Sequence, residues 1–528
     1  MNKLAAVLLM LLVGCTLAFS QAAPKPDPAG TATGSVADVP AAKAGQPTIE
    51  ELANTVGHNR VAINMMWTLI TGFLVMFMQT GFAMVETGLT QAKNAAHTFA
   101  MNFLIYPLGM IGFYVLGFGI MFGGMGAIGT MGGYAGLNHE VTINLFGHAF
   151  GLFGTKGLFL TGVGYDTAVF ALFLFQMVFM DTTATIPTGA MAERWKYSAF
   201  VIYGLLVGSV IYPVFGNWVW GGGWLSQLGA NFGLGHGHVD FAGSSVVHLT
   251  GGVLAFVGAS IIGPRLGKYK KDGSPVAIPA HSIPMAMIGT FILAFGWFGF
   301  NPGSTLAGTD LRISVVAVNT MLAGAFGAFA ATLWMWWVRT GKPDPSMMCN
   351  GMLAGLVAIT APCAFVNAPA ACVIGIIAGV LVVEAALFIE GKLKIDDPVG
   401  AIAVHGVNGA WGCLSLGLFA DGTYGDGWNG VPGTVTGLFY GNASQFFAEC
   451  IGVATNCVVI GLLGFIMFKL IDVTIGLRVK PEVEAEGLDL DEMGVPGYVG
   501  VVDNLAMPEH AMQPSKAGLS RALPAESR

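Results

Sequence analysis

Charged side chains are scarce in this chain, because Asp, Glu, Lys and Arg make up only 10% of its 528 residues. Soluble domains carry about 25% charged residues, whereas this chain is 54% hydrophobic and has a mean hydropathy of +0.69. This composition excludes a large soluble protein and predicts a polytopic membrane protein. Glycine is abundant instead, at 77 residues. Small residues let membrane helices approach closely, so this abundance suits a tightly packed helical bundle.

Several chemical signatures are also missing. The 23 lysines and arginines form no basic stripe of the kind that binds nucleic acid. The seven cysteines include no C-x-x-C pair or other metal-ligand spacing, and six of them lie in apolar segments, where cysteine behaves as a small buried hydrophobic residue. There is no recognisable nucleophile–base constellation or cofactor-binding loop. The sequence therefore predicts no enzyme, no metal site and no resident cofactor.

The N-terminus has the features of a secretory signal. A positively charged start precedes the apolar run 4–13, which is too short to span a membrane. Cleavage near Ala22 is one interpretation, and a lipoprotein-type processing box ending at Cys15 is the alternative. We expect residues 1–23 to be a signal peptide and residues 24–58 to be a disordered periplasmic segment, since its first part is rich in Pro, Ala and Gly.

Eleven apolar segments of the sequence are long enough to cross a ~30 Å hydrocarbon core. We therefore predict an all-α polytopic membrane protein with eleven transmembrane helices. Its membrane domain would cover residues 59–472, and a polar cytoplasmic tail would cover residues 473–528. The predicted spans lie near residues 62–85, 96–122, 166–191, 197–220, 244–263, 279–301, 312–338, 348–365, 370–391, 401–419 and 444–470.

Lysine and arginine are unevenly distributed between the predicted loops. If the first span starts outside, the outer loops after it carry only Lys156 and Arg312, whereas fourteen basic residues fall in the cytoplasmic loops and at the start of the tail. Basic residues accumulate on the cytoplasmic side of membrane proteins. We therefore expect the N-terminus outside and the C-terminus in the cytoplasm, in a protein of the inner (plasma) membrane.

One nine-residue pattern, D-x-x-G-x-x-x-V-H, occurs twice, at residues 240–248 and 397–405. The predicted orientation places Asp240 at the outer start of its span and Asp397 at the inner start of its own. The two motifs therefore run in opposite directions across the membrane. This indicates that spans one to five and six to ten form an inverted repeat, with the last span as a brace, and that a substrate path lies between the two halves.

The histidines of the two motifs are the leading candidates for function. Eight helical residues rise ~12 Å, so His248 and His405 would each lie near the middle of the bilayer. A stacked pair of imidazoles can share a proton and line a narrow polar track. A hydrogen bond to a neighbouring helix and a bis-histidine haem site are the alternatives.

Aromatic residues are predicted to surround the outer end of this path. Trp297, Phe298 and Phe300 stand near Ser304 at the outer end of one span, where an aromatic cage would attract a small cation. Phe179 from another span can face Phe300 as a hydrophobic constriction.

Four carboxyl groups lie inside or beside apolar segments. Asp240 and Asp397 each open a helix and are expected to cap its N-terminus, and Asp240 can also stabilise an incoming cation. Glu86 and Asp181 lie within apolar runs, where such groups rarely face lipid. The sequence leaves the roles of these last two open.

These residues resemble the ammonium transporter, methylammonium permease and Rhesus family over roughly residues 60–500, and the basic residues and the tail favour its microbial transporter branch. The resemblance rests on Phe175-Gln-Met-Val-Phe179, Gly189-Ala-Met-Ala-Glu193-Arg194, Val219-Trp220-Gly-Gly-Gly223, the segment from Asp240 to His248, the segment from Gly296 to Ser304, Asp396-Asp397-Pro with Val404-His405-Gly406, and the tail from Gly476 to Asp489.

The resemblance implies the ammonium transporter fold and a homotrimer with one pore in each subunit. Ammonium, or methylammonium as its analogue, would be recruited outside, lose a proton and pass as ammonia, and in the transporters the proton crosses as well. The implied substrate-binding residues are Trp220, Ser304, Phe179 and Asp240, and the implied pore residues are Phe179, Phe300, Trp297, His248 and His405.

The family's tail is a docking surface for PII-type regulatory proteins, so the resemblance also implies such a partner at residues 473–528, besides membrane lipid. Three other functions remain as alternatives. One is an ammonium sensor that signals through this tail, and the second is an electroneutral Rhesus-like ammonia channel. The third is a haem-carrying redox subunit.

Overall fold

The computed structural model describes residues 35–132 and 135–498. The predicted signal peptide, residues 24–34 and the end of the tail lie outside the described residues. The chain divides into two compact units, residues 1–62 and 63–528.

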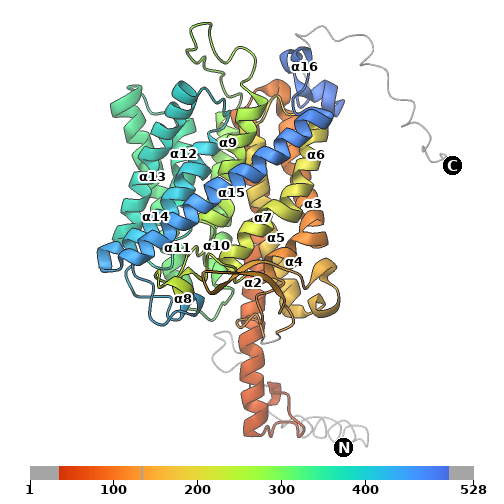
Figure 1. Cartoon of the computed structure of the whole chain (residues 1–528), viewed down its shortest axis with the longest axis vertical. Coiled ribbons are helices and arrows are strands. Elements are labelled where there is room, and N and C mark those ends of the chain that lie inside the picture. Colours follow the sequence, from red (N-terminus) through yellow and green to blue (C-terminus); the bar gives the residue numbers. More distant parts are fainter. Residues whose placement is uncertain (1–34, 133–134, 499–528) are drawn as a thin grey trace, which may run out of the picture. The chain divides into compact units, whose positions relative to one another are not determined.

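Ten helical segments of the described chain are long and apolar enough to cross a membrane (Figure 1). Several contain a short π-helical or 3-10 turn, and both kinds of turn carry an η label. The segments are α2 (Ile49–Leu89); η2 (Ala92–Asn94) with α3 (Ala95–Gly112), η3 (Phe113–Gly117) and α4 (Phe118–Phe122); α5 (Thr167–Ala190); α6 (Tyr197–Leu206), η6 (Val207–Ile211) and α7 (Tyr212–Trp220); η7 (Ser244–Leu249) and α9 (Thr250–Ile262); α10 (Ile283–Phe300) with η8 (Pro302–Thr305); α11 (Ile313–Trp334) with η9 (Met335–Arg339); α13 (Ala368–Phe388) with η10 (Ile389–Leu393); η11 (Ile402–Val407) and α14 (Asn408–Phe419); and α15 (Ala443–Ile475).

An eleventh apolar helix, α12 (Pro345–Ile359), lies where the eighth span was predicted, but it has only 15 residues. The all-α membrane fold predicted from the sequence is thus confirmed. The remaining short elements are η1 (Val36–Asp38), β1 (Glu140–Leu145), β2 (His148–Gly154), η4 (Leu158–Leu160), η5 (Gly162–Gly164), α8 (Leu228–Phe232), η12 (Trp428–Gly430), η13 (Leu438–Tyr440), α16 (Pro481–Glu486) and η14 (Asp489–Met493).

The prediction of disorder up to residue 58 is wrong for residues 49–58, which form the first turns of α2. A capping box starts this helix: the Glu51 amide donates to the Thr48 hydroxyl (3.2 Å), and the Thr48 amide donates to the Glu51 carboxylate (2.7 Å). Two polar groups that would otherwise need water are satisfied in this way. The apolar pattern alone marks only the later, membrane-spanning part of the helix.

The two copies of the nine-residue motif adopt the same local structure. The Asp240 carboxylate accepts hydrogen bonds from the amides of residues 243–246, and the Asp397 carboxylate accepts from those of residues 399, 400 and 402. The glycine of each motif has a positive φ, 119° at Gly243 and 79° at Gly400. Only glycine takes such angles without strain, so the D-x-x-G spacing is a helix-capping turn.

The packing of the two motifs is antiparallel. Helix α9, which follows the first motif, packs on η11 of the second, and α14, which follows the second, packs on η7 of the first. The crossing is so close that a Cβ added to Gly252 would lie 2.2 Å from the Gly406 nitrogen. Likewise, one added to Gly409 would lie 2.6 Å from the Ser244 carbonyl oxygen. This reciprocity is what an inverted repeat requires.

The first helices of the two halves meet with the same reciprocity. A Cβ added to Gly81 of α2 would lie 2.8 Å from Leu293, and one added to Gly296 of α10 would lie 2.1 Å from Met78. Met78 and Gly81 each precede their counterparts, Leu293 and Gly296, by 215 positions. The halves are therefore related by an approximate two-fold axis, as the opposite directions of the two motifs predicted.

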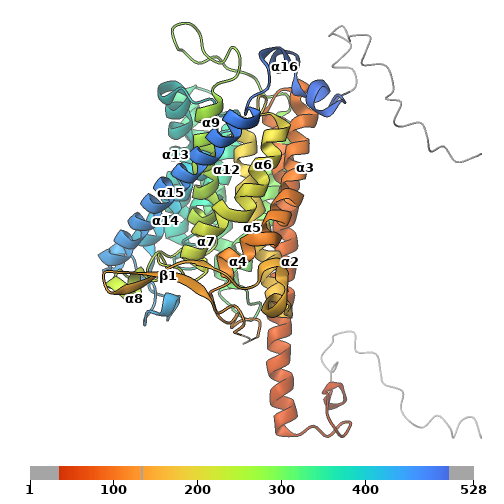
Figure 2. The same cartoon turned by 45° about the vertical axis from the view of Figure 1, so that its right-hand side comes forward.

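Helix α15 is the brace expected from the sequence. It runs obliquely across the bundle and packs on α9, α14 and α6 (Figures 1 and 2). An antiparallel hairpin, β1–β2, lies with α8 at one end of the bundle, and α16 lies at the other. We call these the hairpin end and the tail end. The hairpin was not predicted. Its two-residue turn, Phe146-Gly147, has positive φ at both residues, as the type I′ hairpin turn demands.

Candidate functional site

The two motif histidines meet at the crossing of the halves. Their Nδ1 atoms are 3.2 Å apart, and the rings stack with centroids 5.2 Å apart and an interplanar angle of 26°. Both side chains are buried, His248 completely and His405 to within 4%. One Nδ1 donates to the other, so the pair shares a single hydrogen. A haem iron between these nitrogens would need its porphyrin plane between the rings, and direct contact of the rings excludes that alternative.

A column of aromatic rings leads from the histidines toward the hairpin end. His248 stacks on both Trp297 and Phe300, with ring centroids 5.4 Å apart in each case. Phe300 in turn stacks on Phe179 at 4.1 Å, and Phe179 meets the edge of Trp220 at 6.0 Å. The structure thus brings together the five residues that the resemblance implies as pore residues and Trp220, which it implies as a substrate-binding residue. They come from α5, α7, α10, η7 and η11.

The stacked pair of Phe179 and Phe300 closes this column. Both rings are completely buried, and their near-parallel faces, 24° apart, leave no space for an ion between them. Passage along the column therefore requires these rings to move. Such an apolar constriction excludes hydrated ions because it offers no replacement for their water ligands.

Beyond the constriction lie Trp220, Ser304 and Asp240. The Trp220 indole nitrogen donates to the Asp240 carbonyl oxygen (2.7 Å), which fixes the ring over Phe179. The Ser304 hydroxyl donates to the Phe300 carbonyl (2.8 Å), so its oxygen remains free to accept. The expected cage is wrong in one member, because Phe298 is 37% exposed and contacts Phe295 instead. Trp220 of α7 contacts the constriction instead, at Phe179.

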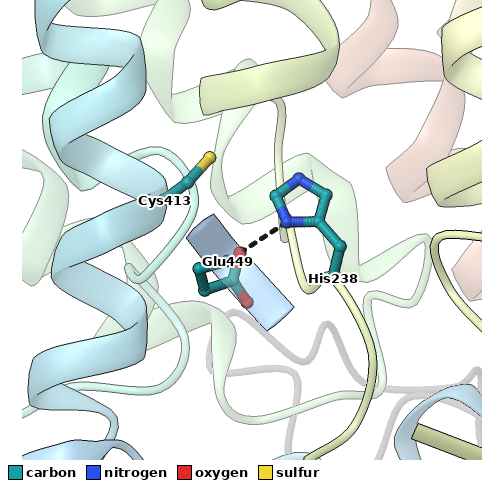
Figure 3. A group of neighbouring side chains, drawn as sticks. All are labelled: His238, Cys413 and Glu449. Carbon is teal, nitrogen blue, oxygen red and sulfur yellow. Dashed lines mark ion pairs between the residues drawn. The ribbon is translucent and has the colours of Figure 1, made fainter. Parts of the chain in front are cut away.

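The Asp240 carboxylate is a structural anchor. Besides four backbone amides it accepts the Ser245 hydroxyl (2.8 Å), which itself contacts the Nε2 of His238 (2.8 Å). His238 pairs through Nδ1 with the Glu449 carboxylate of α15 at 2.6 Å (Figure 3). Although burial opposes its protonation, the charge of Glu449 raises the pKa of His238 above its ordinary value. A continuous polar chain thus ties the brace helix to the cap of η7.

Cys413 completes a buried group of three possible metal ligands with His238 and Glu449, with the ligand atoms within 4.8 Å of one another (Figure 3). Two ligands of one zinc ion, each about 2.0 Å from the metal, would be ~3.3 Å apart in tetrahedral geometry. The 2.6 Å between His238 and Glu449 is a hydrogen-bond distance instead. The residues therefore fit an ion pair better than a metal site. This pair was not predicted, because its partners lie 211 positions apart and nothing in the local sequence of either one indicates the other.

Two cavities follow the histidines toward the tail end. The first, of about 20 Å³, is lined by His405, Phe82 and Glu86 among others, and Phe82 lies 6.1 Å from the His405 ring. The second, of about 280 Å³, includes Asp397 and shares Asn350 and Val399 with the first. Asp181, by contrast, is buried beside Gly109 of α3 and lies outside the column.

An ion network surrounds the tail-end mouth. Arg265 pairs with Glu193 and, through Nε, with Asp396 at 2.8 Å, while Arg194 donates to the Asp396 carbonyl. Burial opposes ionisation of Asp396, but the hydrogen bonds from Arg265 and the charges of Arg194 and Arg265 lower its pKa to about 2. The loops at this end are thus held together by buried charges.

The first part of the tail packs on these loops. Lys93 Nζ donates to the carbonyls of Glu484 and Ala485 (2.7 Å each), and Arg478 pairs with the Glu484 carboxylate at 2.7 Å. Asp489 accepts the amides of Ala96 and His97 at the start of α3. The described tail segment is therefore attached to η2 and to the start of α3.

Comparison with known proteins gives a consistent result for most of the chain. The sequence pattern of the Ammonium Transporter Family matches residues 66–498. The ammonium transporter Amt2 of Archaeoglobus fulgidus is 46% identical over 453 residues, which cover 85% of this chain and 91% of that protein. The ammonium transporter Amt1 of Haloferax mediterranei is 36% identical over 83% of this chain and 79% of its own length.

Two solved structures are similar to this chain over most of its length. A structure titled Sensor Amt Protein has a TM-score of 0.72 and 35% sequence identity, and the match covers 83% of this chain and 99% of that one. The crystal structure of Candida albicans Mep2 has a TM-score of 0.66 and 25% identity over 80% of this chain and 87% of its own.

Proposed function

The chain belongs to the ammonium transporter family, as its motifs predicted, and on this basis we propose that it takes up ammonium through the column and the twin histidines. Its relatives are membrane transport proteins, so it is not an enzyme. The proposal places the hairpin end outside and the tail end in the cytoplasm, in the plasma membrane, in agreement with the distribution of lysine and arginine.

Ammonium first binds where Trp220 and Ser304 meet the constriction. The indole face attracts the cation, and the Ser304 oxygen accepts a hydrogen bond from one of its N–H groups. Asp240 contributes its negative charge to this region without contacting the ion, since its carboxylate oxygens are taken by the cap of η7. The outer site thus concentrates a small cation at the mouth of a path that is closed to ions.

Transfer then needs the loss of a proton. A charged ion at the centre of a membrane costs several kcal/mol, whereas neutral ammonia does not bear this cost. Once deprotonated, ammonia passes Phe179 and Phe300 and is handed along His248 and His405, whose neutral rings offer both a donor and an acceptor. K⁺ has a similar size but cannot lose its charge, so the same path rejects it.

The observation that carries this proposal is the unbroken series of contacts from Trp220 to His405, ending at cavities that reach the tail end. The test is the current across a planar membrane or liposome that holds the purified protein, after a pulse of ammonium and then of K⁺. We expect a transient current with ammonium alone. Equal currents for the two ions would contradict the proposal.

An ammonium sensor is the second candidate, because the solved Sensor Amt Protein is 35% identical over most of the chain and because the tail packs on the loops at the mouth of the column. A sensor would bind ammonium without net flux. An electroneutral ammonia channel would give no current but would raise the pH inside vesicles. A sensor would give neither a current nor a change in pH. An electrogenic transporter differs from both because it gives a current.

We further propose that the protein is a homotrimer and that its tail receives a PII-type regulator, as in the family it belongs to. Light scattering of the detergent-solubilised protein tests the first point. The second is tested by comparing PII binding to the full chain and to a chain that ends at residue 480.

A further inference from the structure

The two halves of the pore differ at one pair of equivalent positions. The first helices of the halves share the spacing G-[F/W]-x-x-x-[E/N]-x-G, at residues 81–88 of α2 and 296–303 from α10 into η8, each residue 215 positions from its counterpart. Glu86 therefore corresponds to Asn301. One half of the pore carries a carboxyl group where the other carries a neutral amide.

The aromatic residues of this spacing confirm that the positions are equivalent in space. Trp297 lies on His248 with ring centroids 5.4 Å apart, and Phe82 lies on His405 at 6.1 Å. Glu86 follows Phe82 by four residues, so both lie on the same face of α2, one turn apart. The carboxyl group is thus one helical turn beyond the histidine pair on the tail-end side.

Glu86 is buried among neutral partners. Its side chain is 3% exposed and accepts a hydrogen bond from Asn102 Nδ2 (2.6 Å), while the Thr188 hydroxyl lies 2.7 Å from Oε2 and 2.9 Å from Oε1. Among the described residues, no lysine or arginine pairs with it. An ionised group buried without a cation costs free energy, and taking up a proton removes that cost.

The hydrogen bonds around Glu86 accommodate both of its protonation states. The Thr188 hydroxyl also lies 2.5 Å from the Thr185 carbonyl oxygen, and its single hydrogen can go to only one acceptor at a time. When that hydrogen bonds Glu86, the carboxyl group is ionised. When it turns to Thr185, the Thr188 oxygen can accept the proton of a neutral Glu86. No partner has to move for the proton to arrive or leave.

Glu86 shares its cavity with the second histidine. The cavity of about 20 Å³ is large enough for one water molecule. Nδ1 of His405 is engaged by His248, which leaves Nε2 as the nitrogen available to such a water. The other titratable groups near Glu86 are Asp397, below the cavity, and Tyr203, whose hydroxyl is bonded to the Ala184 carbonyl.

We propose that Glu86 is the proton-accepting residue of the inner half of the pore, receiving a proton from His405 through one water. The proposal rests on the transport function proposed above. The proton lost by ammonium adds to Nε2 of His248, the hydrogen between the two Nδ1 atoms moves to His405, and the Nε2–H bond of His405 breaks. The water takes that proton and gives up another, so an O–H bond forms on Glu86. Both rings end neutral, and Glu86 loses its negative charge. Release of the proton into the larger cavity beside Asp397 restores the carboxylate, so the proton leaves on the same side as ammonia.

The test uses the full chain in liposomes and two simultaneous readings, the ammonium-evoked current and the internal pH. Glu86→Gln keeps an acceptor for Asn102 and a donor for Thr188 but cannot take up a proton. We expect its current to fall by roughly tenfold or more, while ammonia entry continues and makes the interior more alkaline than in the wild type. Glu86→Asp, which restores a carboxyl group, is expected to recover part of the current.

Asp181→Asn is the matched control, since it makes the same carboxyl-to-amide change at a buried site outside the column, and it should behave as the wild type. An unchanged current in Glu86→Gln overturns the inference but leaves the transport function intact. Loss of both current and alkalinisation in a correctly folded variant, judged by its elution volume, also overturns it, because Glu86 would then only shape the pore. If the wild-type protein makes the interior alkaline but gives no current, the inference is overturned. If it gives neither a current nor alkalinisation, the transport function itself is overturned.

Discussion

The half of the pore around His248 and the half around His405 are built alike but surrounded differently. His248 is enclosed by Trp297 and Phe300, with the closed phenylalanine stack above it. His405 meets Phe82 and then opens to two successive cavities. Matched backbones thus create different surroundings: the first half is closed by aromatic rings, and the second contains cavities lined by the carboxyl groups of Glu86 and Asp397.

Removing either histidine is the strongest way to break this comparison. His248→Ala deletes the ring that joins the aromatic stack to the second half, and His405→Ala deletes the ring that joins the first half to the cavities. We expect each to lower ammonium-specific current by roughly a hundredfold, about 3 kcal/mol in activation free energy, or to admit K⁺. Liposome currents check this, and unchanged flux and selectivity in both variants would refute the twin-histidine mechanism.

The symmetric crossing of the halves can be broken by a single methyl group. In Gly252→Ala the new Cβ would lie 2.2 Å from the Gly406 backbone nitrogen, and backbone cannot yield as a flexible side chain does. We expect a loss of about 1–3 kcal/mol in stability, read as a lower unfolding temperature in detergent.

Gly461→Ala is its matched control on the brace helix, where the nearest neighbour of the added Cβ is Val253 at 3.8 Å. There the better helix propensity of alanine should leave stability unchanged or raise it by up to about 1 kcal/mol. Equal unfolding temperatures for the two variants would mean that the crossing tolerates separation.

The two ends of the pore should respond to pH in opposite directions. At the tail end, the pKa of Asp396 is lowered from its ordinary 3.8 to about 2. Its pairing with Arg265 therefore stabilises the fold above pH 4 and is lost as the pH falls toward 2, by about 2 kcal/mol. Unfolding temperatures measured from pH 6 to pH 2 should fall less for Asp396→Asn than for the wild type, and parallel curves would contradict this.

At the hairpin end the sign is reversed. The pKa of His238 is raised above its ordinary 6.5 by Glu449. The contribution of this pair is complete below pH 6.5 and is lost as the pH rises through the raised value. His238→Gln should therefore flatten the alkaline side of the stability curve, and an alkaline limb that persists in this variant would show that another group titrates there.

The smallest expected effect comes from making the first half resemble the second. Trp297→Phe places a phenylalanine beside His248, just as Phe82 lies beside His405. The change also removes the hydrogen bond from the indole nitrogen to Thr360 (3.1 Å). Thr360 keeps its own bond to the Leu356 carbonyl, so we expect a loss of about 1 kcal/mol in stability and a change in current of only a few-fold. A loss as large as that of His248→Ala would give Trp297 a direct part in conduction.

Much of the site was predictable because its residues stand in unusual surroundings in the sequence. His248 and His405 are polar residues in apolar spans at matched distances from an aspartate, which identified both the inverted repeat and the residues at its centre. Phe82 and the cavity that Glu86 shares with His405 were missed, although the G-x-x-x-x-[E/N]-x-G spacing, which occurs in α2 and again from α10 into η8, carried the signal. Phe298 was misplaced because adjacent aromatic residues look alike in sequence, while a helix points them in different directions.

The sequence by itself determined the membrane class and the helical spans, because burial in lipid demands long apolar helices. It also determined the antiparallel halves, because a histidine within an apolar span is conspicuous and the two motif histidines follow the same pattern. Only the tertiary structure decided which groups meet. The pairing of His238 with Glu449 joins residues 211 positions apart, and the cavity of Glu86 and His405 joins α2 to η11. Such contacts depend on how whole helices pack, and nothing in the local sequence of either partner specifies the other.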